Sequence, residues 1–227
     1  MLENYKIDEY RVISQIEPNV IPYGYEYNDK YNGEIYKKGS DILNGLRLGF
    51  TIGSITSDRQ ISPIEEYKLL DIGYGNGDFL KLASNFFECS GYDISEYPVP
   101  ENCKKVYDLN GKYDIVTMWD SFEHIKDNTF IKDLDCEYIV LSVPYCHYNS
   151  NIRKFNETIA DKLFEQYRHF RPDEHIYHYD QWSLSNFMSS CGYELVVLNS
   201  SLEDIVRKNG NCQNILTACY HKVYIND

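Results

Sequence analysis

A short glycine-rich stretch contains the residues best suited to binding a ligand in this chain of 227 residues. It reads Asp71-Ile72-Gly73-Tyr74-Gly75-Asn76-Gly77, between an apolar run and a helical repeat of apolar residues. Glycine lets a backbone turn sharply and approach a ligand where a Cβ atom would collide, and a helix that begins there presents its first amides to the ligand. The stretch therefore predicts a nucleotide-binding loop. Its candidate contacts are Asp71, Gly73, Tyr74, Gly75, Asn76 and Gly77.

An acid at the end of the next apolar run fits the same ligand. Asp93 follows Gly77 by sixteen residues, and a carboxylate there can accept hydrogen bonds from both ribose hydroxyls. The sixth position counted from Gly73 is Asp78, however, and an acid is unfavourable beside the pyrophosphate of a dinucleotide. A nucleotide-dependent oxidoreductase is therefore the less favoured alternative.

A second polar group lies in residues 167–180, which contain three histidines, two arginines and three acids. A neutral imidazole can remove a proton near neutral pH, so His124 and His175 are candidate general bases for a hydroxyl or amine acceptor. We expect His169 and Arg171 to contact the acceptor. The alternative is that these histidines only hold loops in place.

Many of the 22 tyrosines lie near the N-terminus, among prolines and glycines that interrupt any helical pattern. We divide the chain into an arm, residues 1–40, and a single α/β domain, residues 41–227. The arm either packs on the domain or closes over the ligands as a lid. In the second case Tyr25 is a candidate acceptor contact.

The elements that must position these residues alternate between strands and helices. Helical spacing predicts a helix over residues 41–55, capped by Ser40, and another after Gly77. Short apolar runs predict strands at residues 67–72, 89–94, 106–109, 113–119 and 137–143. This alternation indicates a mostly parallel sheet with right-handed crossovers, and a ligand at the carboxyl ends of its strands.

Three motifs in this order resemble those of class I S-adenosylmethionine-dependent methyltransferases. They are the glycine loop, Gly91-Tyr92-Asp93-Ile94 and Trp119-Asp120-Ser121-Phe122-Glu123-His124-Ile125. The likeness covers about residues 69–222 and is closest to the small-molecule branch, with a further likeness of Arg-Pro-Asp-Glu-His to a little-characterised bacterial and phage group. It implies a Rossmann-like, seven-stranded, mostly parallel sheet with helices on both faces and an antiparallel last strand. The last helix and two strands would span residues 183–191, 193–199 and 213–222.

The resemblance also implies S-adenosylmethionine as the cofactor. Its methionine part would lie on the glycine loop and its ribose on Asp93. The adenine would lie between Ile94 and the pair Asp108 and Leu109, and the sulfonium near Trp119 and Asp120. Because the sulfonium is already an activated leaving group, in-line positioning of the acceptor is the main requirement.

The function expected from these residues is methyl transfer to a small-molecule acceptor, whose oxygen, nitrogen or carbon atom stays open. A non-catalytic domain that binds the cofactor or a partner is the alternative. Asp120, Glu123 and His124 are spaced i, i+3 and i+4 and, with His175, could bind a metal. We expect no metal, because a histidine at a helix start is more often hydrogen-bonded.

Charge and cysteine content limit partners and location. The net charge of -13 disfavours a nucleic-acid partner, because it repels a phosphate backbone. No apolar run approaches the roughly 20 residues of a membrane helix. Seven cysteines, an odd number without Cys-x-x-Cys spacing, favour a reducing compartment and hence the cytoplasm. The oligomeric state is left open.

Overall fold

A seven-stranded sheet forms the centre of the molecule in the computed structural model, which describes residues 4–18, 34–58, 66–95, 97–146, 169–207 and 213–224. The strands follow the order β5-β4-β3-β6-β7-β10-β9. Their bounds are Lys68–Ile72 for β3, Glu88–Tyr92 for β4, Lys104–Lys105 for β5, Lys112–Trp119 for β6, Asp135–Pro144 for β7, Tyr193–Asn199 for β9 and Ile215–Lys222 for β10. The first five are parallel, and β10 is antiparallel to β7 and β9. The predicted Rossmann-like sheet with an antiparallel last strand is confirmed.

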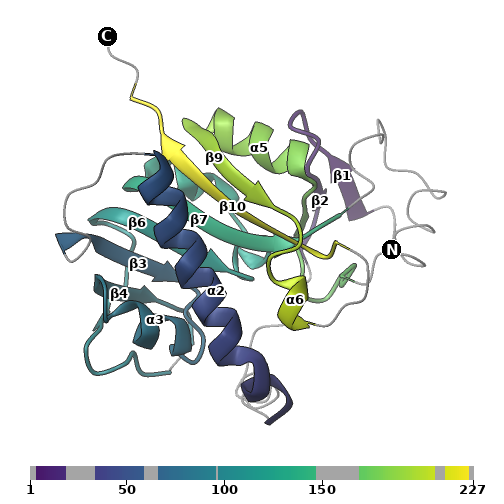
Figure 1. Ribbon diagram of the computed structural model, residues 1–227. Coiled ribbons are helices and arrows are strands. Elements are labelled where there is room, and N and C mark those ends of the chain that lie inside the picture. Colours follow the sequence, from purple (N-terminus) through teal and green to yellow (C-terminus); the bar gives the residue numbers. More distant parts are fainter. Residues whose placement is uncertain are drawn as a thin grey trace.

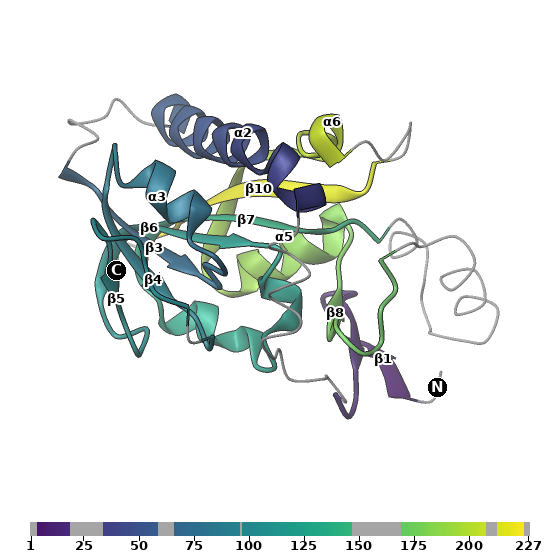
Figure 2. The ribbon, with the colours of Figure 1, turned by 90° about the horizontal axis from the view of Figure 1, so that it is seen from below.

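Helices cover both faces of this sheet, as predicted (Figure 2). One face carries α2 (Glu34–Asp58), α3 (Asp78–Ala83) and α6 (Asp204–Arg207), and α2 runs diagonally across the strands (Figure 1). The other face carries α5 (Gln181–Ser190) and the 3-10 helices η3 (Phe122–His124) and η4 (Asn128–Asp133). None of the described helices is both long enough and apolar enough to cross a membrane.

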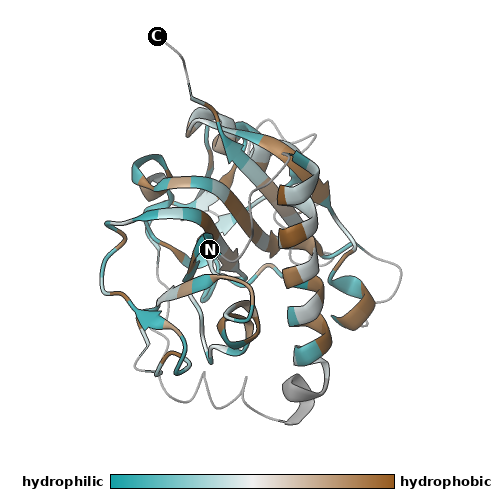
Figure 3. Ribbon diagram, turned by 60° about the vertical axis from the view of Figure 1, so that its left-hand side comes forward, coloured by the Kyte–Doolittle hydropathy of each residue, from teal (hydrophilic) through white to brown (hydrophobic). Residues whose placement is uncertain are grey.

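Each face has its own hydrophobic core because alternate side chains of a strand point to opposite sides. On β3, Leu69 packs in the cluster that contains Leu48 of α2, whereas Leu70 packs in the cluster that contains Phe187 of α5. Figure 3 shows the result as hydrophobic colour along the central strands and alternating bands on α2. The two cores fix the carboxyl ends of β3, β4 and β6, where the predicted site residues lie.

A second, three-stranded sheet joins the N-terminal segment to the histidine-rich loop. It consists of β1 (Tyr5–Ile7), β2 (Ile13–Gln15) and β8 (Tyr177–His178), all antiparallel. Residues 4–18 therefore pack on the loop. The division of the chain at residue 40 stays a prediction, and α2 continues across it. Tyr25 lies outside the described residues.

Two local predictions are wrong. Ser40 does not cap a helix, because α2 begins at Glu34; its hydroxyl instead donates to Asp78 Oδ2 at 3.2 Å. Residues 106–109 are not a strand, since the edge strand β5 ends at Lys105. Asp108 Oδ1 there accepts a hydrogen bond from the amide of Asn110 at 2.9 Å, which is typical of a turn. An edge strand of two residues buries too little to leave an apolar pattern.

Candidate active site

The glycine loop between β3 and α3 has a left-handed backbone at each of its three glycines. The φ angles of Gly73, Gly75 and Gly77 are 79°, 55° and 78°. A Cβ atom on Gly73 would lie 2.6 Å from Ser121 Cβ, and one on Gly77 would lie 3.0 Å from Pro100 Cδ. Among the described residues, and apart from the two chain neighbours of Gly75, no heavy atom lies within 4 Å of the corresponding position on Gly75. The close approach of Ser121 and Pro100 therefore favours glycine at positions 73 and 77. Gly75 instead faces a space that a ligand can enter.

Asp93, at the end of β4, lies directly beside this loop. Its Oδ2 accepts a hydrogen bond from the amide of Gly75 at 2.8 Å, and its Oδ1 accepts one from the amide of Ser95 at 2.6 Å. Ile94 is 77% exposed next to it. The structure thus brings together the loop and the predicted ribose ligand.

Four other residues that were predicted to contact the cofactor make contacts with other parts of the protein. Tyr74 is buried, and its hydroxyl donates to the carbonyl of Tyr97. Asn76 is exposed and donates to Asp78 Oδ2 at 2.8 Å. Asp108 is held in its own turn, and Leu109 packs against the hydrophobic core. The position of Asp108 and Leu109 beside the adenine stays a prediction.

Asp71 lies beneath the loop and is only 2% exposed. Its Oδ1 accepts a hydrogen bond from Thr117 Oγ1, on the neighbouring strand β6, at 2.7 Å. Burial raises the pKa of Asp71 to about 7, against the opposing effects of that hydrogen bond and of the charge of Arg47. The carboxyl therefore supports the loop from within.

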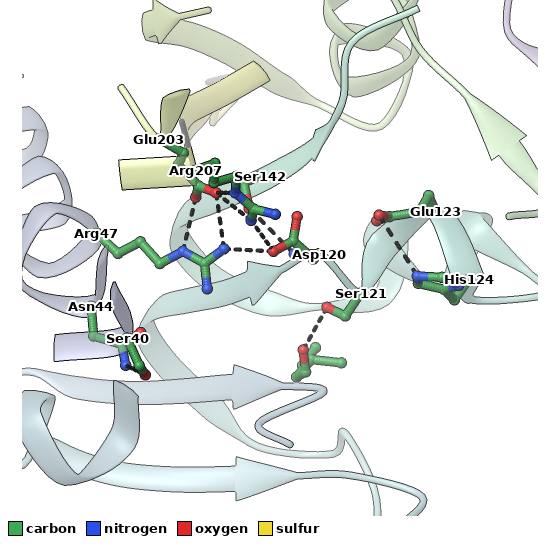
Figure 4. A network of polar contacts seen from close by, with 11 residues as sticks. Ser40, Asn44, Arg47, Asp120, Ser121, Glu123, His124, Ser142, Glu203 and Arg207 are labelled. Carbon is green, nitrogen blue, oxygen red and sulfur yellow. Dashed lines mark hydrogen bonds and ion pairs between the residues drawn. The ribbon is translucent and has the colours of Figure 1, made fainter. Parts of the chain in front are cut away.

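Asp120 follows β6 and belongs to a cluster of four charges (Figure 4). Its Oδ2 lies 2.6 Å from Arg47 Nη2 and also pairs with Arg207, and both arginines pair with the fully buried Glu203. Burial alone would raise the pKa of Asp120, but the charges of Arg207 and Arg47 hold it well below its usual range. Asp120 also has a φ of 52°, an unusual backbone for a residue with a side chain.

Trp119, the last residue of β6, lies between this cluster and α3. Its ring is 5.2 Å from that of Phe79, and the Arg47 guanidinium lies 5.1 Å from its centroid. Arg47, Glu203 and Arg207 were not among the residues predicted from the sequence. One signal was present for Arg47, which shares the buried stripe of its helix with Asn44, Leu48 and Thr51. A buried arginine on such a stripe needs an acidic partner.

His124, one of the two predicted catalytic histidines, lies on the opposite side of Ser121 from the charge cluster (Figure 4). Ser121 Oγ donates to the carbonyl of Ile72 at 2.8 Å, so η3 begins next to the glycine loop. The rings of His124 and His175 lie 4.8 Å apart, centroid to centroid. Their Nδ1 atoms lie 2.7 Å from the carbonyl of Glu174 and 2.8 Å from that of His169.

The two predicted acceptor contacts that the structure describes lie in the same loop. Arg171 Nη1 pairs with Glu174 Oε2 at 2.8 Å, and His169 contributes its carbonyl to His175. Gln15 was not predicted from the sequence; its side chain donates to the carbonyls of Pro172, at 2.7 Å, and His175, at 2.9 Å. No pattern around Gln15 indicated this role.

Burial determines the charge state of this region. It lowers the pKa of His124, and it lowers that of His175 to about 2, helped by the charges of His124 and His178. Burial, and then the charge of Asp120, raises the pKa of Glu123 well above its usual value. The imidazoles of His124 and His175 are therefore neutral at pH 7 and carry a lone pair.

Comparison with known proteins agrees with this arrangement. A family model described as a methyltransferase domain matches residues 56–198, more than half of the chain. No curated protein is significantly similar to the sequence. Among solved structures, magnesium protoporphyrin IX methyltransferase (ChlM) from Synechocystis PCC 6803 with bound SAH superposes with a TM-score of 0.57 and 15% identity, over 88% of this chain and 94% of that one.

Two further structures have the same fold. YcgJ from Bacillus subtilis has a TM-score of 0.54 and 14% identity, over 79% of this chain and 99% of its own. An S-adenosylmethionine-dependent methyltransferase from Mesorhizobium loti has a TM-score of 0.50 and 12% identity, over 71% of this chain and 94% of its own.

The strand order, the left-handed glycine loop and the adjacent acid define a Rossmann-like protein of the class I methyltransferase type. The match over residues 56–198 shows that the chain belongs to the methyltransferase domain family. It is an S-adenosylmethionine-dependent enzyme of this class, as the motifs of its sequence predicted. Family membership argues against the alternative of an oxidoreductase.

Proposed function

We propose that this enzyme transfers the methyl group of S-adenosylmethionine to a small-molecule acceptor. The methionine part of the cofactor would lie on the loop from Gly73 to Gly77, and its ribose on Asp93. The observation that carries this assignment is the open, left-handed backbone of Gly75, whose amide is bonded to the Asp93 carboxylate. A ligand on this loop would thus have a free backbone surface and an acid within reach.

The acceptor would approach from the side of His124 and His175. Ser121 connects this side to the glycine loop, and a neutral imidazole can take the proton of a hydroxyl or amine acceptor. His169, Arg171 and Tyr25 remain candidate contacts. A small molecule suits the net charge of -13, which disfavours a polyanion, and the similarly folded ChlM is named for a porphyrin.

Calorimetric titration with S-adenosylmethionine, S-adenosylhomocysteine and NAD tests the cofactor assignment. We expect the first two to bind and NAD not to bind. Gly75→Val should abolish binding, because a branched side chain would occupy the surface left for the ligand. Gly192→Val is the matched control, since Gly192 also has a positive φ, 87°, and none of the other described residues beyond its chain neighbours has an atom within 4 Å of its Cβ position. Equal affinity of the two variants would refute the loop assignment.

Turnover separates this proposal from a domain that only binds the cofactor. Incubation with S-adenosylmethionine and pools of small hydroxyl, amine and activated-carbon compounds should release S-adenosylhomocysteine with one class of acceptor. Binding without release in every pool would favour the non-catalytic alternative. A cytoplasmic location is also proposed; it is supported by the free thiols of the six cysteines in the described ranges.

A further inference from the structure

Three side chains on the acceptor side bring potential metal ligands together. One donor atom each from Glu123, His124 and His175 lies within 4.8 Å of the others. Glu123 is 1% exposed and His175 is 5% exposed, so the group lies beneath the surface. Such a group is more than an acidic cluster on a surface, because two of its members are imidazoles in fixed orientations.

The hydrogen bonds of the two imidazoles fix which nitrogen carries the proton. The Nδ1 atoms of His124 and His175 each contact a backbone carbonyl, at 2.7 and 2.8 Å. A carbonyl oxygen only accepts hydrogen bonds, so Nδ1 is the protonated donor and Nε2 of the neutral ring has the lone pair. Metal-binding histidines typically donate their second nitrogen to a carbonyl or carboxylate in this way.

Glu123 supplies the independent observation. Its Oε1 lies 3.7 Å from Nε2 of His124, whereas its buried Oε2 has no hydrogen-bond partner among the residues that the structure describes. The two arginines of the charge cluster pair with Asp120 and Glu203. A buried carboxylate oxygen without a partner is costly, and an ion or water is a usual explanation.

We propose that Glu123, His124 and His175 bind a divalent transition-metal cation through one carboxylate oxygen and two Nε2 atoms. This donor set suits Zn²⁺, Co²⁺ or Fe²⁺, whereas Mg²⁺ and Ca²⁺ prefer oxygen ligands throughout. Tetrahedral ligands about 2.1 Å from a cation lie about 3.4 Å apart. Glu123 Oε1 and His124 Nε2, which lie 3.7 Å apart, are close to that spacing, and one possible ligand atom from each of the three residues lies within 4.8 Å of the others.

Three protein ligands leave a coordination position for an oxygen or nitrogen of the acceptor. In the loaded protein both Nε2 lone pairs are occupied, so the proton-acceptor role proposed above would apply only to the cation-free protein. This inference differs from the absence of a metal that we expected from the sequence. The reason is the pair of hydrogen bonds that fixes the tautomers, which no sequence pattern shows.

Titration of the chelator-treated, full-length protein with Co²⁺ tests the site. We expect visible absorption that saturates at one Co²⁺ per chain, displacement by Zn²⁺ and no displacement by equimolar Mg²⁺. Glu123→Gln and His175→Ala should each weaken binding by 10-fold or more, about the effect of losing a ligand or its support. His221→Ala is the matched control, because His221 lies 4.0 Å from Asp58 and 3.9 Å from Glu137 on another surface; it should bind normally.

Thermal unfolding monitored by circular dichroism gives a second measurement. Co²⁺ should raise the Tm of the wild-type protein and leave that of Glu123→Gln, a variant of the same size, unchanged. Absence of Co²⁺ binding, equal binding by Glu123→Gln, or a near-ultraviolet thiolate band at saturation would overturn the proposal. S-adenosylmethionine is titrated separately into the metal-free protein, so failure of the cofactor assignment is distinguishable from failure of the metal site.

Discussion

Replacing Asp71 with asparagine should change how the stability of the enzyme depends on pH. Asp71 is 2% exposed, accepts a hydrogen bond from Thr117 and has a pKa raised by burial to about 7, whereas an unperturbed aspartate titrates at 3.8. Between these two values the folded protein keeps a proton that the unfolded chain has lost. The free energy of unfolding therefore falls as the pH rises, by about 1.4 kcal/mol per pH unit.

The magnitude follows from the width of that interval. The contribution of Asp71 is fully present below pH 3.8 and is lost as the pH rises through about 7, which amounts to about 4 kcal/mol at most. From pH 5 to pH 8 the expected loss is about 2 to 3 kcal/mol. Asparagine has no such proton, and its amide oxygen can still accept the hydrogen bond of Thr117. The free energy of unfolding of the wild type, minus that of Asp71→Asn, should therefore decrease by about 2 to 3 kcal/mol from pH 5 to pH 8.

Urea unfolding at pH 5 and pH 8, followed by circular dichroism, measures this difference. Asp127→Asn is the control, because Asp127 is an exposed acid whose pKa is lowered by hydrogen bonds from Thr129. It is ionised in both states across the range, so its difference from wild type should be flat. A flat difference for Asp71→Asn as well would mean that Asp71 is ionised when folded, and would refute the reasoning.

Three further substitutions test other parts of the site. Asp93→Ala should weaken S-adenosylmethionine binding by roughly 1 to 3 kcal/mol in calorimetry, and unchanged affinity would contradict the ribose assignment. Gly73→Ala should lower the urea midpoint more than Gly192→Ala, because both incur the left-handed backbone cost of roughly 1 to 2 kcal/mol but only the first adds a contact of 2.6 Å. Glu203→Gln should destabilise the fold by about 3 kcal/mol, because it leaves the buried arginines without a full negative charge. Glu174→Gln, at a partly exposed ion pair, should cost about 1 kcal/mol or less. Equal unfolding midpoints of the two variants would contradict this.

The central strands were predictable because burial on both faces leaves continuous apolar runs. The run at residues 67–72 differs from β3, Lys68–Ile72, by one residue. The same reasoning failed for β5, which has two lysines at the sheet edge and little apolar surface. It also placed the start of α2 seven residues late, at Asp41 instead of Glu34.

The glycine loop and Asp93 were predictable because their roles are set by local backbone geometry. In the structure, the amide of Gly75 donates a hydrogen bond to the carboxylate of Asp93. Arg47 and Glu203 are 156 residues apart and pair only because α2 and α6 cover the same face. Charge pairs of this kind depend on the tertiary arrangement of elements, and charged residues alone do not indicate it.

The end of β6 determines how the two halves of the site lie relative to each other. Trp119 packs under Arg47, Asp120 enters the charge cluster, and Ser121 is bonded to the strand that carries the glycine loop. Two residues further on, Glu123 and His124 face the histidine loop. One short segment thus fixes the predicted cofactor side to the predicted acceptor side. Methyl transfer depends mainly on in-line alignment, so a rigid link of this kind is the contribution that the fold itself can make to the reaction.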